Sequence, residues 1–292
     1  MFEQLGLIGC GLMGGSFALA LKRAGLVKRV VGYSKSPSTT ELARQMGVID
    51  VEAPSALLAV SGADIVLLAV PVSATESTFK AIRHLITPET LVMDVGSTKR
   101  DVVDAARRVL RDQVGCFVPA HPITGREVSG VEHADANLYS GKQVILTPIE
   151  RTFTVQLKKA VDIWTALGCN VTQMSPQAHD AAYAAVSHLP HLIAFTLMNS
   201  IAGQAQGSDY LSLAGPGFRD FTRIAASEPK MWRDILMANR EELLAQSKIF
   251  QQTLQSLEKL IQDSEGDALE QQIEHASQRR ANLHISLQKP YK

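Results

Sequence analysis

Residues 4–17 read QLGLIGCGLMGGSF, and this stretch decides the fold. A short apolar run ends at glycines spaced G-x-G-x-x-G, and the apolar residues that follow recur at helical spacing. Gly9 would make the tight turn, Gly11 would let the backbone approach a pyrophosphate, and Gly14 would let helix and strand pack closely. A structural glycine turn is the alternative. We expect cofactor contacts from Gly9, Cys10, Gly11, Leu12, Met13 and Gly14.

The second strand, Arg29–Tyr33, ends at Ser34-Lys35-Ser36. An NAD enzyme usually has an acidic residue here, about twenty positions beyond the glycines, for the ribose hydroxyls. A carboxylate would repel a ribose phosphate, whereas two hydroxyls and an ammonium can hold one. The sequence therefore favours NADP, with NAD possible and an ordinary solvated turn as the alternative.

Further apolar segments alternate with helical ones, which predicts an α/β fold with a Rossmann-type doubly wound sheet. The expected strands are Ala63–Pro71, Leu91–Val95, Cys116–Ala120, Val144–Thr147 and Asn170–Met174, and the expected helices are 38–46, 73–86, 99–110 (capped by Ser97) and 153–166. Ligands bind beyond the carboxyl ends of such strands. We therefore expect Val70, Pro71, Gly96 and His121 to line the same crevice as the glycines.

The composition changes at Ser175-Pro176, a helix cap followed by a proline in the first turn. We predict a dinucleotide-binding domain over 1–174 and an all-helical substrate and dimerisation domain over 175–292. An apolar stripe over 186–201 should be kinked at Pro190. A long helix from Pro229 repeats apolar residues every seven positions. This seam could pack inside one chain, but it favours a homodimer formed through the helical domain.

Composition excludes several classes of protein. Lysine plus arginine equals aspartate plus glutamate, 29 each among 292 residues, so charge indicates neither a nucleic acid partner nor an anionic membrane. The three cysteines are widely spaced, which argues against disulfides or a zinc site and suggests the reducing cytoplasm. We expect no secretion signal and no apolar run that approaches a membrane span.

His121 directly follows a predicted strand, at the crevice, where a base could take the proton of an alcohol being oxidised. A structural histidine is the alternative. His188 and His191 flank the expected kink, where substrate hydrogen bonding or packing is favoured over metal binding. Arg219 and Arg223 share a helix face suited to a carboxylate, unless Arg223 only pairs with Asp220.

These residues together resemble the prephenate and arogenate dehydrogenases of tyrosine biosynthesis. The motifs that carry the resemblance, in order along the chain, are GLIGCGLMGGS (6–16), DVGSTK (94–99), HPITGREVSGVE (121–132), SHLPH (187–191) and GPGFRDFTRIA (215–225). The first motif is shared by many dehydrogenases, whereas the later four are specific. The resemblance implies an oxidative decarboxylation in which a ring carbon gives hydride to the nicotinamide, carbon dioxide leaves and the ring becomes aromatic.

The resemblance also implies roles for individual residues. His121 would be the general base on the ring hydroxyl, and Ser97 would share that hydroxyl and orient the nicotinamide. Arg223 and His191 would hold the substrate carboxylate and side chain, Asp220 with His179-Asp180 would support Arg223, and Glu127 would lie at the mouth. The full set of expected substrate contacts is Thr124, Glu127, His188, His191, Gly215, Pro216, Arg223 and Trp232.

The chain departs from the family pattern in lacking the acidic residue typical of NAD use, and we expect neither a fused chorismate mutase nor an ACT domain. An acid such as Glu127 near the substrate side chain would favour the ammonium of arogenate. Two other functions stay open on the residues alone. One is a β-hydroxyacid-type dehydrogenase that uses Lys99, and the other is a non-catalytic NADP-sensing module.

Overall fold

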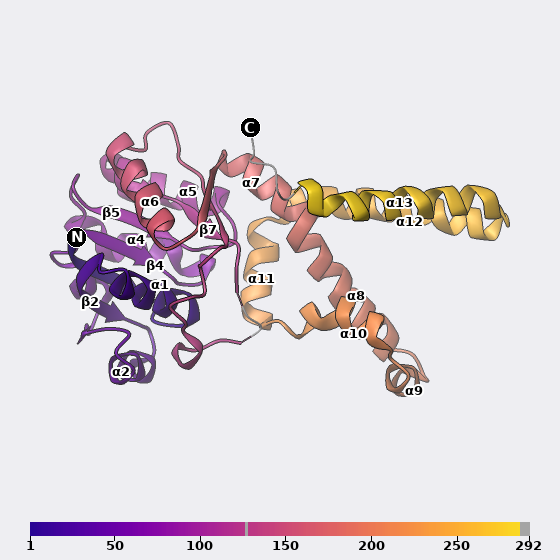
Figure 1. Cartoon of the computed structure of the whole chain (residues 1–292), viewed down its shortest axis with the longest axis horizontal. Coiled ribbons are helices and arrows are strands. Elements are labelled where there is room, and N and C mark those ends of the chain that lie inside the picture. The colour runs from indigo at the N-terminus through magenta and orange to yellow at the C-terminus, as the bar shows by residue number, and fades with distance from the viewer. Residues whose placement is uncertain (126–127, 287–292) are drawn as a thin grey trace. The chain divides into compact units, whose positions relative to one another are not determined.

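The computed structural model describes residues 1–125 and 128–286 (Figure 1). By contacts the chain divides into two compact units, Met1–Arg240 and Glu241–Lys292. The first unit contains a parallel sheet, a smaller second sheet and a group of helices, and it is described first.

A six-stranded parallel sheet with strand order β3-β2-β1-β4-β5-β6 forms the centre of the first unit. Its strands are β1 (Phe2–Ile8), β2 (Val27–Tyr33), β3 (Val51–Glu52), β4 (Ile65–Leu68), β5 (Leu91–Asp94) and β6 (Phe117–Val118). Strand order reverses direction at β1, which pairs with β2 on one side and β4 on the other. The predicted doubly wound sheet is confirmed, and its ligand crevice should open between the ends of β1 and β4.

Helices cover both faces of this sheet, because successive strand residues point to opposite faces. Leu67 of β4 belongs to a core with Phe17 and Trp164, whereas Leu68 belongs to a core with Phe79. The helices are α1 (Leu12–Arg23), α2 (Pro37–Gln45), α3 (Ala56–Val60), α4 (Thr75–Ile82), α5 (Arg100–Leu110) and α6 (Thr154–Ala166). All the predicted helices of this region form, with shifts of a few residues at their ends.

The strand predicted over Cys116–Ala120 was wrong, because the chain changes sheets within it. Phe117–Val118 pairs with β5, whereas β7 (Ala120–Pro122) starts a second sheet with β8 (Gln143–Leu146) and β9 (Asn170–Gln173). Pro119 lies at the change, and a proline cannot donate to a strand ladder. The second sheet holds the strands predicted near 144–147 and 170–174.

The helices of the first unit after residue 175 begin as predicted. The Ser175 hydroxyl accepts a hydrogen bond from the Ala178 amide at 3.1 Å, and Pro176 occupies the first turn of α7 (Pro176–Tyr183). A π-helical turn, Ala184–His188, leads into α8 (Leu189–Ala202). The turn lies where Pro190 would crowd the carbonyl of Val186, and a wider turn relieves that crowding. The predicted interruption at Pro190 therefore takes the form of a π turn.

Three more helices and a 3₁₀ turn complete the first unit. They are α9 (Gly207–Ser212), α10 (Pro216–Thr222), η6 (Arg223–Ala226) and α11 (Pro229–Ala238). In Figure 1, α11 stands between the sheet domain and α8. The hydroxyl of Ser73, just after β4, donates to Asp234 of α11 at 2.5 Å, so α11 contacts the carboxyl end of the sheet directly.

One helix in the described part of the chain, Pro176–Ala202, is long and apolar enough to cross a membrane by length and composition alone. This corrects our expectation that no apolar run approaches that length. Core helices of soluble proteins pass the same test, and this helix carries polar groups, among them the buried Asp180 and His188. Only 17% of its most apolar window is buried within one chain. A second chain packed on this helix would cover its exposed apolar side chains.

The second unit contains α12 (Arg240–Gln262), apart from its first residue, which belongs to the first unit, and α13 (Gly266–Ser286). A turn with Ser264 at φ 57° joins the two helices. The predicted continuous helix from Pro229 was wrong, because it breaks at Asn239, where α11 ends. Phe250, Leu254 and Ile261 of the predicted seam are 37%, 43% and 63% exposed, so one chain leaves much of the seam uncovered.

Candidate active site

The glycine loop after β1 has the backbone that a pyrophosphate site requires. Gly9 has φ 97°, and a Cβ on it would lie 2.2 Å from the carbonyl oxygen of Ala69. A Cβ on Gly14 would lie 2.0 Å from the carbonyl oxygen of Gly9. A Cβ on Gly11 would meet no described atom within 4 Å, and no described side chain caps the start of α1. Open space beside uncapped helix amides fits a bound pyrophosphate.

The hydroxyl of Ser34 supports this loop from the end of β2. It accepts a hydrogen bond from the Cys10 amide at 2.9 Å, and the Ser34 amide donates to Thr40 at 3.1 Å. Lys35 and Ser36 are exposed beside the start of α2. The Ser34 side chain therefore holds the glycine loop in place, whereas the side chains of Lys35 and Ser36 are exposed to solvent.

The other expected cofactor residues lie at strand ends of the same sheet. Leu12 is buried, and the Met13 carbonyl accepts from the Tyr139 hydroxyl at 2.7 Å, so these two residues also anchor α1 to the core. Val70 and Pro71 follow β4, and Gly96 follows β5. A Cβ on Gly96 would lie 3.1 Å from Val72, so the ends of β4 and β5 are close together.

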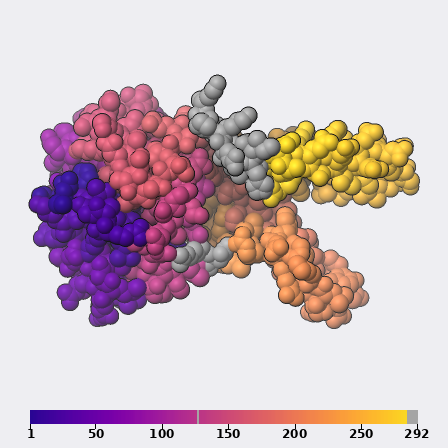
Figure 2. Space-filling view, viewed as in Figure 1, coloured from indigo at the N-terminus to yellow at the C-terminus, as the bar shows by residue number. Residues whose placement is uncertain are grey.

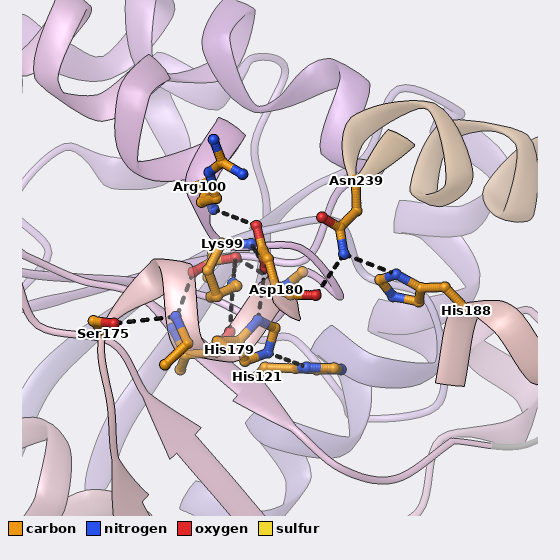
Figure 3. A network of polar contacts seen from close by, with 12 residues as sticks. Lys99, Arg100, His121, Ser175, His179, Asp180, His188 and Asn239 are labelled. Atoms are coloured by element: carbon orange, nitrogen blue, oxygen red, sulfur yellow. Dashed lines mark hydrogen bonds and ion pairs between the residues drawn. The ribbon is translucent and has the colours of Figure 1, made fainter. Parts of the chain in front are cut away.

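His121 lies in β7 and starts a chain of three polar side chains (Figure 3). Its Nδ1 is 2.8 Å from Nε2 of His179, and Nδ1 of His179 is 2.7 Å from Oδ1 of Asp180. The ring of Tyr183 contacts both histidines, stacked on His179 at a centroid distance of 4.6 Å. We call His121, His179 and Asp180 the relay.

The relay determines which nitrogen of each ring carries hydrogen. Burial alone would raise the pKa of Asp180, but hydrogen bonds from His179 and from backbone amides lower it. The ionised carboxylate can only accept, so His179 donates from Nδ1 and its Nε2 accepts from Nδ1 of His121. Burial, with the nearby His179 and Lys99, holds the pKa of His121 well below its usual value. Nε2 of neutral His121 is therefore left with a lone pair that can take a proton.

The start of α5 holds the relay at its far end. The Lys99 and Arg100 amides each donate to a carboxylate oxygen of Asp180 at 2.9 Å. The prediction that Ser97 caps this helix was wrong, since α5 begins at Arg100 and Asp180 binds its first amides. The hydrogen bonds of His179 and Asp180 described here join His121 to α5, and the support that these residues and Asp220 would give to Arg223 stays a prediction.

Lys99 is fully buried, and its ammonium group lies 2.5 Å from Asp94 and donates to the Ala120 carbonyl at 2.8 Å. A lysine that acts on a β-hydroxyacid would have to reach the substrate. The structure thus gives the β-hydroxyacid alternative no support.

His188 lies behind the relay, 1% exposed. The amide nitrogen of Asn239 donates to the Asp180 carbonyl at 2.8 Å and lies 3.1 Å from Nδ1 of His188. Asn239 thus makes His188 carry its hydrogen on Nε2. That nitrogen has no hydrogen-bond partner within residues 1–125 and 128–286.

His191 and Trp232 form a stacked pair between α8 and α11, with ring centroids 3.5 Å apart and planes inclined by 20°. Nδ1 of His191 lies 2.9 Å from the Ser187 carbonyl, so it carries the hydrogen and Nε2 is the free acceptor of the neutral ring. Next to Trp232 is a cavity of about 540 Å³, lined largely by apolar residues of α8, η6 and α11.

The remaining expected substrate contacts are more dispersed. Gly215 and Pro216 are exposed at the start of α10, and Arg223 is exposed where η6 begins, beside α8. The Thr124 hydroxyl donates to the Leu138 carbonyl at 3.2 Å. Glu127 lies outside the described residues. The expected contact of Arg223 with the substrate carboxylate stays a prediction.

Local sequence patterns did not reveal the relay. His121 and His179 are 58 residues apart, and Asn239 is 59 residues from Asp180. The one available signal was the pair His179-Asp180 four residues after a strong helix cap, and its partner could not be read from spacing. Within the described residues, no group of three or more His, Cys, Asp or Glu side chains could hold a metal ion.

Comparison with known proteins gives consistent results. Sequence models of prephenate dehydrogenase match along the chain, the nucleotide-binding domain over residues 17–173 and the dimerization domain over residues 175–275. Prephenate dehydrogenase of Bacillus subtilis is 38% identical over 84% of this chain, which spans 66% of that protein. Cyclohexadienyl dehydrogenase of Zymomonas mobilis is 33% identical over 97% of both chains. The structure of Aquifex aeolicus prephenate dehydrogenase with hydroxyphenyl propionate and NAD⁺ superposes with a TM-score of 0.90, at 36% identity, over 97% of this chain and 98% of that one.

We predict that acidification destabilises the protein through His188. Burial, with the nearby His179 and His191, lowers the pKa of His188 to about 4, against an attraction from Asp180 that raises it. Below pH 6.5 the unfolded chain binds a proton at this position that the folded chain does not. The contribution of neutral His188 to the free energy of unfolding is therefore complete above pH 6.5 and is lost as the pH falls towards 4.

Urea unfolding at pH 7.5 and 4.5 measures this effect. Between pH 7.5 and 4.5 the free energy of unfolding of the wild type should fall by about 1–3 kcal/mol more than that of His188→Gln. His275→Gln, at an exposed position of α13, is the control and should behave like the wild type. Equal losses in the wild type and His188→Gln would show that His188 is not the group responsible.

Proposed function

The chain belongs to the prephenate dehydrogenase family, and we propose that it oxidatively decarboxylates prephenate or arogenate, with His121 as the base. Such a reaction serves tyrosine biosynthesis. The observation that carries the role of His121 is the relay, which leaves Nε2 of His121 as a hydrogen-bond acceptor on a strand that is bonded to the end of β5 through Ala120 and Asp94.

The bound cofactor would supply a nicotinamide ring that accepts hydride from the substrate carbon bearing the hydroxyl. Gly11, beside open space at the start of α1, would admit the pyrophosphate, while Gly9 and Gly14 allow the close packing that shapes the loop. Val70, Pro71 and Gly96, at the ends of β4 and β5, would border the nicotinamide half.

In the chemical step, Nε2 of His121 takes the proton of the ring hydroxyl as the carbon beneath it loses hydride. The carbon–carboxylate bond breaks, its electron pair enters the ring and carbon dioxide leaves. The ring becomes aromatic, and its phenolate oxygen takes the proton back from His121. The positive charge gained by His121 is shared through His179 with the carboxylate of Asp180, which favours protonation at this moment. Ser97, half-buried after β5, would share the hydroxyl and orient the nicotinamide.

The helices after residue 175 would hold the rest of the substrate. The guanidinium of Arg223 would bind a carboxylate in bidentate fashion. His188 would donate from its buried Nε2, and His191, stacked on Trp232, would accept through its own Nε2. The acceptor Nε2 of His191 suits the ammonium of arogenate. Thr124, Glu127, Gly215 and Pro216 would complete the pocket.

We further propose that NADP is preferred over NAD. The end of β2 carries Ser34, Lys35 and Ser36 where an acidic residue would mark NAD use. Ser34 is occupied with the Cys10 amide, so Lys35 and Ser36 are the groups that would hold the ribose phosphate.

We also propose that the protein works as a cytoplasmic homodimer formed through the helices after residue 175. The largely exposed apolar side chains of Pro176–Ala202 and of α12 support this, as does the match to a dimerization domain.

Replacing His121 by asparagine tests the base. We expect kcat to fall by roughly 10²–10⁴ with a small change in the KM of the substrate, because the proton acceptor is lost while binding contacts stay. Steady-state assays of NAD(P)H formation with prephenate and with arogenate measure both. A variant with nearly wild-type kcat would rule out His121 as the base.

Arg223→Ala should act mainly on the KM of the substrate, because the variant loses a charged hydrogen bond worth about 1.5–3 kcal/mol. Arg151→Ala, at an exposed arginine of the nucleotide-binding half, is the matched control and should leave KM unchanged. If Arg223→Ala also leaves KM unchanged, the carboxylate contact is assigned to the wrong residue.

Lys35→Glu should lower kcat/KM for NADP and spare or raise that for NAD, since a carboxylate repels the ribose phosphate. The assay crosses both cofactors with both substrates for the wild type, the variant and the control Lys28→Glu. A wild type that prefers NAD, or a Lys35→Glu enzyme with an unchanged cofactor ratio, would disprove the NADP proposal.

A further inference from the structure

The strand that carries His121 has one edge that pairs with no neighbouring strand among the described residues. The Thr147 amide donates to the Pro119 carbonyl at 2.9 Å, and the Ile123 amide donates to the Gln143 carbonyl at 2.8 Å. Residues 119 and 123 therefore face β8, and because strand residues alternate, the amide and carbonyl of Ala120 face the opposite edge. These two groups lie next to His121 in the chain.

Two side chains take the place of a neighbouring strand at this edge. Oδ1 of Asp94 accepts from the Ala120 amide at 3.1 Å, and Nζ of Lys99 donates to the Ala120 carbonyl at 2.8 Å. The Asp94 and Lys99 side chains are 3% and 0% exposed, and Nζ is 2.5 Å from Oδ2 of Asp94. Both backbone groups of Ala120 are thus held by one buried ion pair.

The turn that joins these two residues also holds the other end of the relay. Oδ2 of Asp94 accepts from the Gly96 amide at 2.8 Å, and the Lys99 amide donates to Asp180 at 2.9 Å. Residues 94–100 therefore contact the backbone beside His121 and the carboxylate that orients His179. Figure 3 shows Lys99 next to Asp180 and the relay.

We propose that Asp94 and Lys99 are positioning residues that aim the His121 imidazole at the substrate hydroxyl. The inference rests on the proposed role of His121 as the base. A buried ion pair is a poor device for stability alone, because desolvation offsets much of its attraction. Its directional bonds to Ala120 instead fix the backbone beside the base, and a misplacement of about 1 Å can cost 10²-fold in rate.

The pair also acts on the charge of His121. Burial is the main cause of the low pKa of His121. The nearby His179 and the ammonium of Lys99 also disfavour a positive charge on its imidazole. The titratable groups packed around His121 are Asp94, Lys99, His179, Asp180, Tyr183 and His188. Loss of the Lys99 charge should therefore make His121 easier to protonate.

The test compares Lys99→Met with the double variant Asp94→Asn/Lys99→Met, which leaves no unpaired buried charge. In both we expect kcat to fall about 10²-fold with little change in the KM of the cofactor. The acid limb of the kcat pH profile should move to higher pH in Lys99→Met, and by less in the double variant. Phe79→Leu, a change in a core cluster that contains neither His121 nor Lys99, should lower Tm without moving that limb.

Nuclear magnetic resonance of the His121 ring nitrogens supplies a readout that does not need turnover. A changed ring pKa or tautomer in the folded double variant supports the positioning role. Wild-type kcat, pH profile and ring signals in that variant would overturn it. A wild type that turns over neither prephenate nor arogenate would instead overturn the proposed function, and the ring signals would still decide the positioning role.

Discussion

The site depends on one buried carboxylate, that of Asp180. Its oxygens accept from two backbone amides at the start of α5, and one of them also accepts from His179. A buried charge is costly unless it is met by several donors, and here a helix start and an imidazole meet it. Because α7 carries the carboxylate and the nucleotide-binding half carries α5, the same bonds join the two halves of the site.

This constraint explains why the relay has a direction. An ionised carboxylate only accepts, so each ring of the relay must donate towards Asp180 and leave its other nitrogen as an acceptor. Low pKa values of both histidines, caused first by burial, keep the rings neutral at rest. Nε2 of His121 is therefore free to accept a proton if His121 is the base that we propose, and the carboxylate would compensate the charge that the ring gains.

The glycine loop imposes a second and independent constraint. Gly9 and Gly14 are required by close packing of backbone against backbone, whereas space is left only beside Gly11. Packing and cofactor binding thus use different glycines of one motif. The ends of β4 and β5 lie beside each other at the edge of the sheet where ligands bind in such folds, and Asp94 at the end of β5 bonds the backbone next to His121.

The sequence alone determined the fold class, the glycine loop and the helix start at Ser175, and it singled out His121 as a candidate, because each rests on a local pattern of period, cap or motif. Only the tertiary structure decided the partners of His179, Asp180, Lys99 and Asn239, since those bonds join residues far apart in the chain. It also decided that the strand before His121 breaks at Pro119 and that the helix from Pro229 breaks at Asn239. Local propensity cannot foresee such breaks, because hydrogen bonds made elsewhere in the fold determine where each segment ends.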